Sequence, residues 1–317
     1  MTGSNFQDSG RIHDADATGL AAAAAIVANG GCVAVPTETV YGLAADATNA
    51  AAVANIYATK GRPSFNPLIV HVADIEMAET FALFDATARK LAERYWPGPL
   101  TIVLPRSTNC QIAVAATAGL DTIALRCPAH PVIQALIAST GRPLAAPSAN
   151  ASGGVSPTTA AHVLASLGER VPLILDGGPC VEGVESTIVA IGADALTVLR
   201  PGSITADMLS AATGQRVGKQ VGDEIIAPGQ LHSHYAPGKP MLLDCEAPPS
   251  DAFVIGFGPG NCDVQLSAVG NLAEAAHNLF AALHAGASSA KPRIAVPPIP
   301  NIGVGIAIND RLRRASA

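Results

Sequence analysis

The chain contains few charged and few aromatic residues, and these two shortages limit the core and the sites that it can build. Of its 317 residues, 14% are charged and 4% are aromatic, whereas 49% are hydrophobic. The core must therefore be assembled from Ala, Val, Leu and Ile, which favours layered α/β packing around short aliphatic strands. The length exceeds that of a usual single core, so two domains are expected.

The sequence also lacks a metal-binding or disulfide pattern. Its six cysteines form no CxxC pair, and no histidine stands beside them at the spacing of zinc ligands. We therefore expect six reduced, mostly buried thiols in a reducing compartment. We therefore predict no metal ligand and no nucleophilic cysteine from the sequence.

Signals for secretion or membrane insertion are missing as well. Asp8, Asp14 and Asp16 precede the first alanine run, which is the wrong charge for a signal peptide. No apolar stretch is long enough to span a membrane. We expect a cytoplasmic protein with no membrane partner. The net charge of −6 disfavours broad, nonspecific binding to a phosphate backbone, although it is compatible with a local basic cleft.

Polar residues are concentrated in two segments, PTETVYGL at 36–43 and KGRPSFNPLIVH at 60–71. The second segment supplies Lys60, Arg62 and His71, which are cationic or protonatable, and the first supplies two threonines and Glu38. Short polar contacts of this kind suit a small anionic ligand. The sequence leaves open whether Glu38 orients a cation or has a structural role.

Hydrophobic runs and chain breakers predict an alternation of helices and strands. The expected helices cover 18–29, 49–59, 87–95, 131–140 and 271–285, with Thr18 capping the first and Gly30 ending it. The expected strands cover 32–35, 68–72, 101–104, 122–126, 173–175, a hairpin of 186–191 with 196–199, 241–244, 252–256 and 294–296. PTETVYGL thus begins where a buried strand ends, the usual place for a ligand site in an α/β sheet.

Regular hydrophobic periodicity fades between residues 214 and 240. We therefore expect a larger α/β domain at 1–213, a linker at 214–240 and a small α/β domain at 241–317. The linker contains His234 and Tyr235, side chains that a pure spacer does not need.

Several further signals are weak when taken singly. Ser148–Ser156 is a loop of small polar residues and glycines that suits a phosphate, but it also suits a capping turn in which Ser156 starts the next helix. Arg126 and Arg200 each end an aliphatic strand, where a solvated surface arginine is the better expectation for either one taken singly. His71 within an apolar strand fits a core histidine. The GFGPG run at 256–260 lacks the full dinucleotide-binding glycine pattern and is interpreted as a turn.

The ordered set PTETVYGL, KGRP, NPLIVH, PSAN, ESTIV and LRPG is far more specific than any one of its members. In this order, the set resembles the YrdC-like family of L-threonylcarbamoyladenylate synthases. SHYAPGKP and the terminal AINDRLRRAS resemble the long form, which carries an extra C-terminal domain. The resemblance implies a twisted, open mixed sheet of YrdC type followed by a smaller Rossmann-like α/β domain.

The family joins L-threonine, bicarbonate or CO2, and ATP into threonylcarbamoyl-AMP and pyrophosphate. The resemblance therefore implies a nucleotidyltransferase, with Lys60 and Arg62 as the catalytic cations. It places Thr37, His71, Arg126 and Ser186 around L-threonine. It places Lys60, Arg62, Thr122, Ser148, Asn150, Ser156, Arg200 and Tyr235 at ATP.

These residue types suit a reaction that needs no enzyme nucleophile. The carbamate of threonine attacks the α-phosphorus of ATP, so two anions must be aligned and their charge neutralised. The resemblance implies Mg²⁺ as a cofactor that accompanies ATP. Threonylcarbamoyl transferase proteins would then use the product to modify tRNA beside the anticodon, and a weak contact with tRNA is a further expectation.

Three questions remain open at this point. The segment around Tyr235 fits either a lid that excludes water from the adenylate or a rigid strap between domains. One alternative function is a carbamoyl-adenylate-forming maturation enzyme. Another is a tRNA-binding or ribosome-assembly module, which the acidic balance and the few aromatic residues disfavour.

Overall fold

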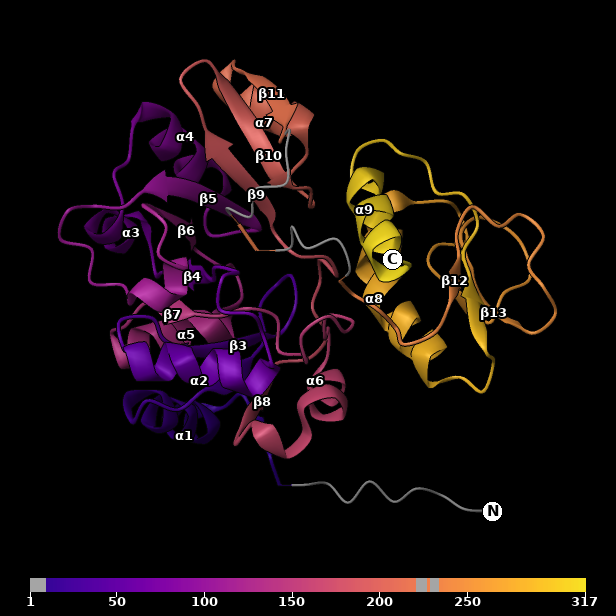
Figure 1. The fold of residues 1–317 in the computed structure, drawn as a ribbon, viewed down its shortest axis with the longest axis horizontal. Helices are drawn as coiled ribbons and strands as arrows, with labels where there is room; N and C mark the ends of the chain where they lie inside the picture. The colour runs from indigo at the N-terminus through magenta and orange to yellow at the C-terminus, as the bar shows by residue number, and fades with distance from the viewer. Residues whose placement is uncertain (1–9, 221–226, 229–233) are drawn as a thin grey trace.

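Two α/β domains make up the computed structural model, which describes residues 10–220, 227–228 and 234–317 (Figure 1). The N-terminal domain contains β1 (Ile12–Asp14), α1 (Ala17–Ala28), β2 (Val33–Val35), β3 (Gly42–Asp46), α2 (Ala50–Lys60), β4 (Ile69–His71), α3 (Ile75–Phe81), α4 (Ala86–Tyr95), β5 (Leu100–Pro105), η1 (Val114–Thr117), β6 (Thr122–Arg126), α5 (Pro131–Thr140), β7 (Leu144–Ala145), α6 (Ala160–Leu167), η2 (Gly168–Arg170), β8 (Ile174–Asp176), β9 (Thr187–Ile191), β10 (Ala195–Arg200), α7 (Ala206–Thr213) and β11 (Arg216–Lys219). The C-terminal domain contains β12 (Met241–Leu242), β13 (Ala252–Gly256), β14 (Val264–Gln265), α8 (Leu272–Ser288), β15 (Arg293–Ala295) and α9 (Gly305–Ala315).

The N-terminal domain is built on one mixed sheet. Within the described residues its strand order is β1-β8-β2-β3-β7-β4-β6-β5-β9-β10-β11. Parallel pairs such as β4–β6 alternate with antiparallel pairs such as β5–β6. Helices α1 and α5 pack together in one apolar cluster, and α2, α4 and α6 contribute to another. The expectation of a mixed α/β sheet is confirmed, and the clusters consist mainly of aliphatic side chains.

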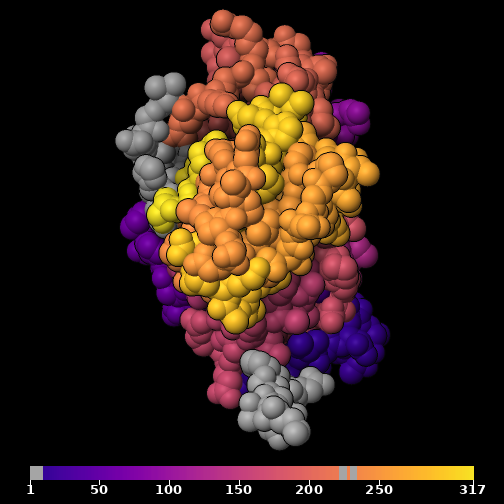
Figure 2. Space-filling view, turned by 90° about the vertical axis from the view of Figure 1, so that its right-hand side faces the viewer, coloured from indigo at the N-terminus to yellow at the C-terminus, as the bar shows by residue number. Residues whose placement is uncertain are grey.

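The C-terminal domain contains a small parallel sheet in the order β12-β15-β13-β14 among its described residues. The connection from β13 to β15, which pair in parallel, passes through the short β14 and then α8, so the expected βαβ arrangement is present. Helices α8 and α9 lie on the side of this domain that faces the N-terminal domain (Figure 1). Seen from the right-hand side of Figure 1, the C-terminal domain lies in front and covers part of the N-terminal domain (Figure 2). The predicted second, smaller α/β domain is confirmed.

The structure corrects the sequence interpretation at two local points. Asp16, rather than Thr18, caps α1, because its carboxylate accepts the backbone N–H groups of Thr18 and Gly19 at 2.9 and 2.8 Å. The strand β3 (Gly42–Asp46), which starts in the last two residues of PTETVYGL and lies between β2 and β7, was also not among the expected strands. Its Gly-Leu-Ala-Ala-Asp sequence has little strand propensity, so pairing on both sides stabilises it.

The structure also bears on what was expected of the linker, of the cysteines and of membrane-spanning segments. β11 pairs with β10 inside the segment that was expected to be a linker, whereas residues 221–226 and 229–233 of that segment lie outside the described residues. All six cysteines are free thiols. No helix in the described part of the chain is long and apolar enough to cross a membrane.

Candidate functional site

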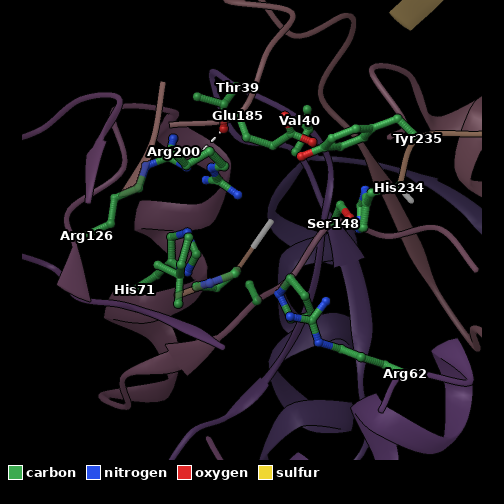
Figure 3. A pocket seen from close by; sticks show the side chains of 14 residues that line it. Thr39, Val40, Arg62, His71, Arg126, Ser148, Glu185, Arg200, His234 and Tyr235 are labelled. Carbon is green, nitrogen blue, oxygen red and sulfur yellow. Dashed lines mark hydrogen bonds between the residues drawn. The ribbon is translucent and has the colours of Figure 1, made fainter. Parts of the chain in front are cut away.

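A pocket opens where strand ends of the large sheet meet the segment between the domains (Figure 3). It has a volume of about 480 Å³, including space open to solvent. The lining residues are Thr39, Val40, Arg62, Ile69, His71, Arg126, Ala146, Pro147, Ser148, Glu185, Arg200, Pro228, His234 and Tyr235. Five of them were predicted site residues outside the linker, and they come from distant parts of the sequence.

One wall of the pocket, the strand wall, consists of Thr39, His71 and Arg126. His71 ends β4 and lies opposite Arg126, which ends β6, in the parallel register of these strands. Arg126 donates from Nε to Gly98 O at 3.2 Å and from Nη1 to Thr39 Oγ1 at 2.9 Å, and its Nη2 pairs with Glu38 at 2.6 Å. Glu38 therefore orients a cationic side chain, that of Arg126, which is one of the two roles that the sequence left open.

Arg126 still has capacity for a ligand. Two of the five N–H groups of the guanidinium, on Nε and Nη1, donate hydrogen bonds, whereas Nη2 has an ion pair with Glu38 but no hydrogen-bond partner within the described residues. Two parallel N–H groups are what a carboxylate needs for bidentate binding. The ion pair with Glu38 thus fixes the arginine without using its whole binding fork.

His71 is a neutral imidazole in this wall. It is buried, and its Nδ1 atom has no hydrogen-bond partner within the described residues. Burial, and after it the positive charge of Arg126, lowers the pKa of His71 to about 3. An unpartnered buried nitrogen at a pocket wall is suited to a ligand hydroxyl or amine.

Thr39, rather than the predicted Thr37, reaches the pocket. The Thr37 hydroxyl donates to Val40 O at 2.7 Å and accepts the backbone N–H groups of Thr39 and Val40 at 3.1 and 3.2 Å. Thr37 therefore closes a turn of the chain, and that turn presents the next threonine. The assignment of Thr37 to L-threonine stays a prediction, and the structure adds Thr39, which a sequence alone does not single out because it does not show which side chain a tight turn keeps for itself.

A second group of lining residues, which we call the loop wall, consists of Arg62, Ser148, Arg200, His234 and Tyr235, of which Arg200 lies beside Arg126 (Figure 3). Arg62 follows the left-handed Gly61 that ends α2, and it donates to Asn66 O at 3.3 Å and Pro67 O at 3.0 Å. Arg200 follows a register shift in the β9–β10 pair and donates to Ser186 O and Oγ, each at 3.0 Å. Both arginines are thus held by uncharged oxygens.

The positive charges of Arg62 and Arg200 bear on the kind of ligand that the pocket would accept. Burial lowers the pKa of Arg62 and of Arg200 to about 10 each, because each guanidinium is removed from water. At neutral pH both remain charged, and the oxygens to which they donate carry no formal charge. A polyanionic ligand would supply the missing compensation.

Lys60 and Asn150 shape the pocket without lining it. The Lys60 ammonium donates to Ser148 O at 2.6 Å and to Asn150 O at 2.5 Å, and burial lowers its pKa well below the usual value. Asn150 donates to Ala151 O and Gly154 O, each at 2.8 Å. The two side chains therefore hold the PSAN loop so that Ser148 faces the pocket.

A Cβ on Gly42 would approach the Ala146 side chain to 3.1 Å, so this close strand contact favours glycine.

Three other predicted site residues, Ser186, Ser156 and Thr122, are not among the lining residues of the pocket. Ser186 Oγ bonds to Thr101 Oγ1 at 2.7 Å and to Arg200, so it supports the loop wall from behind. Ser156 donates to Glu185 at 2.5 Å and does not start the next helix, whose N-cap is Thr159. Thr122 begins β6, at the other end of the strand from Arg126, and does not line the pocket.

The sequence interpretation missed Thr39, Glu185, His234 and Arg311 as residues at or beside the pocket. His234 and Glu185 line it, and Arg311 of α9 is fully buried against Glu185 at 2.9 Å. Glu185 and His234 directly precede nominated residues in the ESTIV and SHYAPGKP motifs, which was an available signal. Nothing in the local sequence pairs Arg311 with a residue 126 positions earlier.

Comparisons with known proteins agree with this architecture. Residues 25–202 match the family model Sua5_yciO_yrdC, which is described as Telomere recombination, and residues 204–317 match the family described as Threonylcarbamoyl-AMP synthase, C-terminal domain. The chain belongs to the Sua5/YrdC family. It is 47% identical over 235 residues to the threonylcarbamoyl-AMP synthase of Bacillus subtilis, a match that covers 73% of this chain and 67% of the relative.

The long, two-domain members of the Sua5/YrdC family match along almost the whole chain. Identity to the threonylcarbamoyl-AMP synthase of Pyrococcus abyssi is 38%, over 93% of each chain. The crystal structure of P. abyssi Sua5 complexed with L-threonine aligns with a TM-score of 0.86 and 36% identity, over 94% of each chain. The resemblance inferred from the ordered motifs is therefore confirmed, including the extra C-terminal domain.

Proposed function

We propose that this chain is an L-threonylcarbamoyl-AMP synthase, a nucleotidyltransferase that uses L-threonine, bicarbonate or CO2, and ATP. The observation that carries the proposal is the pocket itself, which is lined by Arg126 and His71 together with Arg62 and Arg200, two arginines buried against uncharged oxygens. One side offers a bidentate site for a carboxylate, and the other offers charge for phosphates. The relatives named above carry this activity in their names, and the P. abyssi structure contains L-threonine.

The reaction divides naturally between the two walls. On the strand wall, Arg126 would bind the threonine carboxylate, and Thr39 and His71 would contact the rest of the amino acid. The amine adds to CO2 and gives a carbamate, whose oxygen attacks the α-phosphorus of ATP as the bond to pyrophosphate breaks. Catalysis then requires alignment of two anions and neutralisation of the charge on the departing pyrophosphate.

On the loop wall, Arg62 and Arg200 would take the triphosphate, with Ser148 and Tyr235 toward the rest of the nucleotide. Lys60, Asn150, Ser156 and Ser186 would act by holding the loops that carry these groups. Thr122 keeps its assignment to ATP as an expectation. Tyr235 is buried at the pocket, and the lid role of its segment stays a prediction.

Magnesium would enter with the nucleotide. The two carboxylates nearest the pocket, Glu38 and Glu185, are already paired with Arg126 and Arg311. In the part of the chain that the structure describes, no group of three or more His, Cys, Asp or Glu could hold a metal ion. The residues therefore do not fit a protein-held cation, and we propose that Mg²⁺ is bound by the ATP phosphates as part of the substrate.

The product would be consumed by proteins that transfer the threonylcarbamoyl group to the adenosine beside the anticodon of tRNA. A mixed anhydride of this type hydrolyses readily, so its transfer has to follow soon after its formation. Direct contact of this chain with tRNA is not needed for the reaction, and a weak contact remains an expectation.

The decisive experiment measures pyrophosphate release with ATP, Mg²⁺ and bicarbonate in the presence of each amino acid in turn. We expect release that depends on L-threonine and bicarbonate, with threonylcarbamoyl-AMP identified by mass spectrometry. Release with ammonia or carbamoyl phosphate in place of threonine would favour the maturation-enzyme alternative. Binding of tRNA with no pyrophosphate release would favour the RNA-binding module.

A further inference from the structure

Helix α9 of the C-terminal domain carries a buried arginine that reaches the pocket of the other domain. Arg311 is 0% exposed, and its Nε donates to Glu185 Oε2 at 2.9 Å. Its Nη1 donates to Asp310 Oδ2 at 2.8 Å. A guanidinium buried to this degree is stable only with partners, and one of its two carboxylate partners is a pocket residue.

Glu185 is an unexpected residue for a pocket that receives phosphates. It lines the pocket and is 6% exposed, and its other oxygen accepts the Ser156 hydroxyl at 2.5 Å. Burial alone would raise the pKa of Glu185, but Arg311 first and Arg200 second lower it to about 2. The carboxylate is therefore ionised at neutral pH and, without compensation, would repel a nucleotide in the same pocket.

Arg311 also contacts a second lining residue. Its guanidinium lies 5.5 Å from the centre of the Tyr235 ring, within the range of a cation–π interaction. Tyr235 adopts a left-handed backbone conformation with φ of 67° and packs against Phe280 of α8 with a ring distance of 5.5 Å. A tyrosine in this conformation needs surrounding contacts to hold it, and Arg311 is one of them.

Other hydrogen bonds between the domains reach backbone atoms, as in the one from the N–H of the lining residue His234 to Arg314 O at 3.1 Å. His277 bonds to Val181 O at 2.8 Å, and His284 bonds to Ser156 O at 3.1 Å. Both contacts reach backbone carbonyls of residues that do not line the pocket. Arg311 instead touches one charged and one aromatic lining residue at once, so its effect on ligand binding is separable from the docking of the domains.

We propose that Arg311 is a positioning residue for the nucleotide, which compensates the charge of Glu185 and fixes the Tyr235 ring at the loop wall. The C-terminal domain thereby supplies part of the electrostatic environment of the pocket. This inference rests on the proposed synthase function. It predicts that loss of Arg311 weakens ATP binding and leaves L-threonine binding intact, because the strand wall is held by Glu38 and Gly98.

The test compares Arg311→Met, Arg311→Lys, Glu185→Gln and the double variant Arg311→Met/Glu185→Gln in the full-length chain. Arg293→Ala serves as the control, because Arg293 pairs with Asp251 on the exposed surface of the same domain. KM for ATP, KM for L-threonine and kcat are measured from threonine-dependent pyrophosphate release. ATP affinity is also measured by calorimetry without threonine.

We expect Arg311→Met to raise KM for ATP at least tenfold while KM for L-threonine stays within about twofold. Arg311→Lys should recover part of the loss, since it restores the charge without the planar fork. The double variant should bind ATP better than Arg311→Met, because the uncompensated carboxylate is gone. Arg293→Ala should behave as the unmodified protein.

An unchanged KM for ATP in Arg311→Met would overturn the inference. Equal rises in both KM values, with no recovery in the double variant, would also overturn it and assign Arg311 a purely structural role. If Arg311→Met does not fold, the double variant is compared with Glu185→Gln, and the inference requires weaker ATP binding in the double variant, because it lacks the cation that fixes the Tyr235 ring. Absence of threonine-dependent release in the unmodified protein would instead refute the proposed function.

Discussion

Arg126 and Arg62 are both buried arginines of the same pocket, and they differ in what neutralises them. Arg126 has the Glu38 carboxylate at 2.6 Å, whereas Arg62 has the carbonyl oxygens of Asn66 and Pro67. The first arginine is compensated before any ligand arrives, and the second is not. Arg126 therefore offers a ligand mainly hydrogen-bond donors in a fixed orientation, whereas Arg62 also offers it a net positive charge.

The same contrast extends to the two walls as wholes. The strand wall places His71 and Arg126 at the ends of paired strands, whose register fixes their separation. The loop wall depends on the PSAN loop, the segment around Tyr235 and a side chain of the other domain. A ligand of constant shape, such as an amino acid, suits the first wall, and a long flexible polyanion suits the second. The following predictions test this division of roles.

The largest effect is expected for Arg62→Ala. Loss of an uncompensated cation should reduce kcat/KM for ATP by about 10²–10³-fold, roughly 3–4 kcal/mol, and change KM for L-threonine little. The measurement is threonine-dependent pyrophosphate release over a range of ATP concentrations. Arg89→Ala is the matched control, because Arg89 pairs with Glu79 on the exposed surface. A loss confined to L-threonine would reverse the assignment of the walls.

A smaller effect is expected for Arg126→Lys, and it should fall on the other substrate. One ammonium cannot satisfy Glu38, Thr39, Gly98 and a carboxylate together, so KM for L-threonine should rise about 10–100-fold. KM for ATP should stay within about threefold. Isothermal titration with L-threonine checks the binding step directly, and normal threonine affinity would contradict the role of Arg126.

Substitution of the two threonines of PTET should have different effects, one on the binding of L-threonine and the other on the stability of the fold. Thr39→Val removes the acceptor for Arg126 Nη1, so KM for L-threonine should rise about three- to tenfold. Thr37→Val opens the turn instead and should lower the free energy of unfolding by about 1–2 kcal/mol, with a smaller change in KM. Kinetics and urea unfolding of both variants check this. A larger KM effect in Thr37→Val would restore Thr37 as the ligand contact.

The smallest effect at neutral pH concerns His71 and His234, one on each wall. Burial, as the main cause, lowers the pKa of each to about 3, below the value of about 6.5 expected in the unfolded chain. Stability from these neutral imidazoles is complete above pH of about 6.5 and is lost as pH falls toward about 3.

Replacement of either histidine by Gln should therefore flatten the fall of stability below pH 6.5, by up to about 1.4 kcal/mol per pH unit. Urea unfolding between pH 4 and pH 8 measures the slope. Near pH 7.5, only His71→Gln should change KM for L-threonine. A change in threonine affinity of similar size in His234→Gln would show that the walls are not separate.

Much of the fold could be predicted from the sequence because aliphatic runs, glycines and prolines mark its elements. The strand 122–126 and the helix 131–140 were predicted with the bounds that the structure shows. β3 was missed, since its small residues become a strand only between β2 and β7. Asp16 was missed as a cap because Thr18, two residues later, is an equally good capping type.

The candidate site could be predicted as a set of motifs but not as a set of contacts. Ordered motifs identified Arg62, His71, Arg126, Ser148, Arg200 and Tyr235, all of which line the pocket. The roles of Lys60 and Asn150 as supports of a loop depend on side-chain directions that no local pattern encodes. Arg311 depends on a contact between domains, which is a property of the tertiary structure.

The ion pair between Arg311 and Glu185 has a consequence for biosynthesis. The chain emerges from the ribosome from its N-terminus, so every strand of the large sheet is available before α9 has been made. Until α9 has been made, Glu185 lacks its arginine partner, although the strands of the large sheet are already present. Affinity for the nucleotide is therefore expected to rise when α9 is added to a sheet that has already formed.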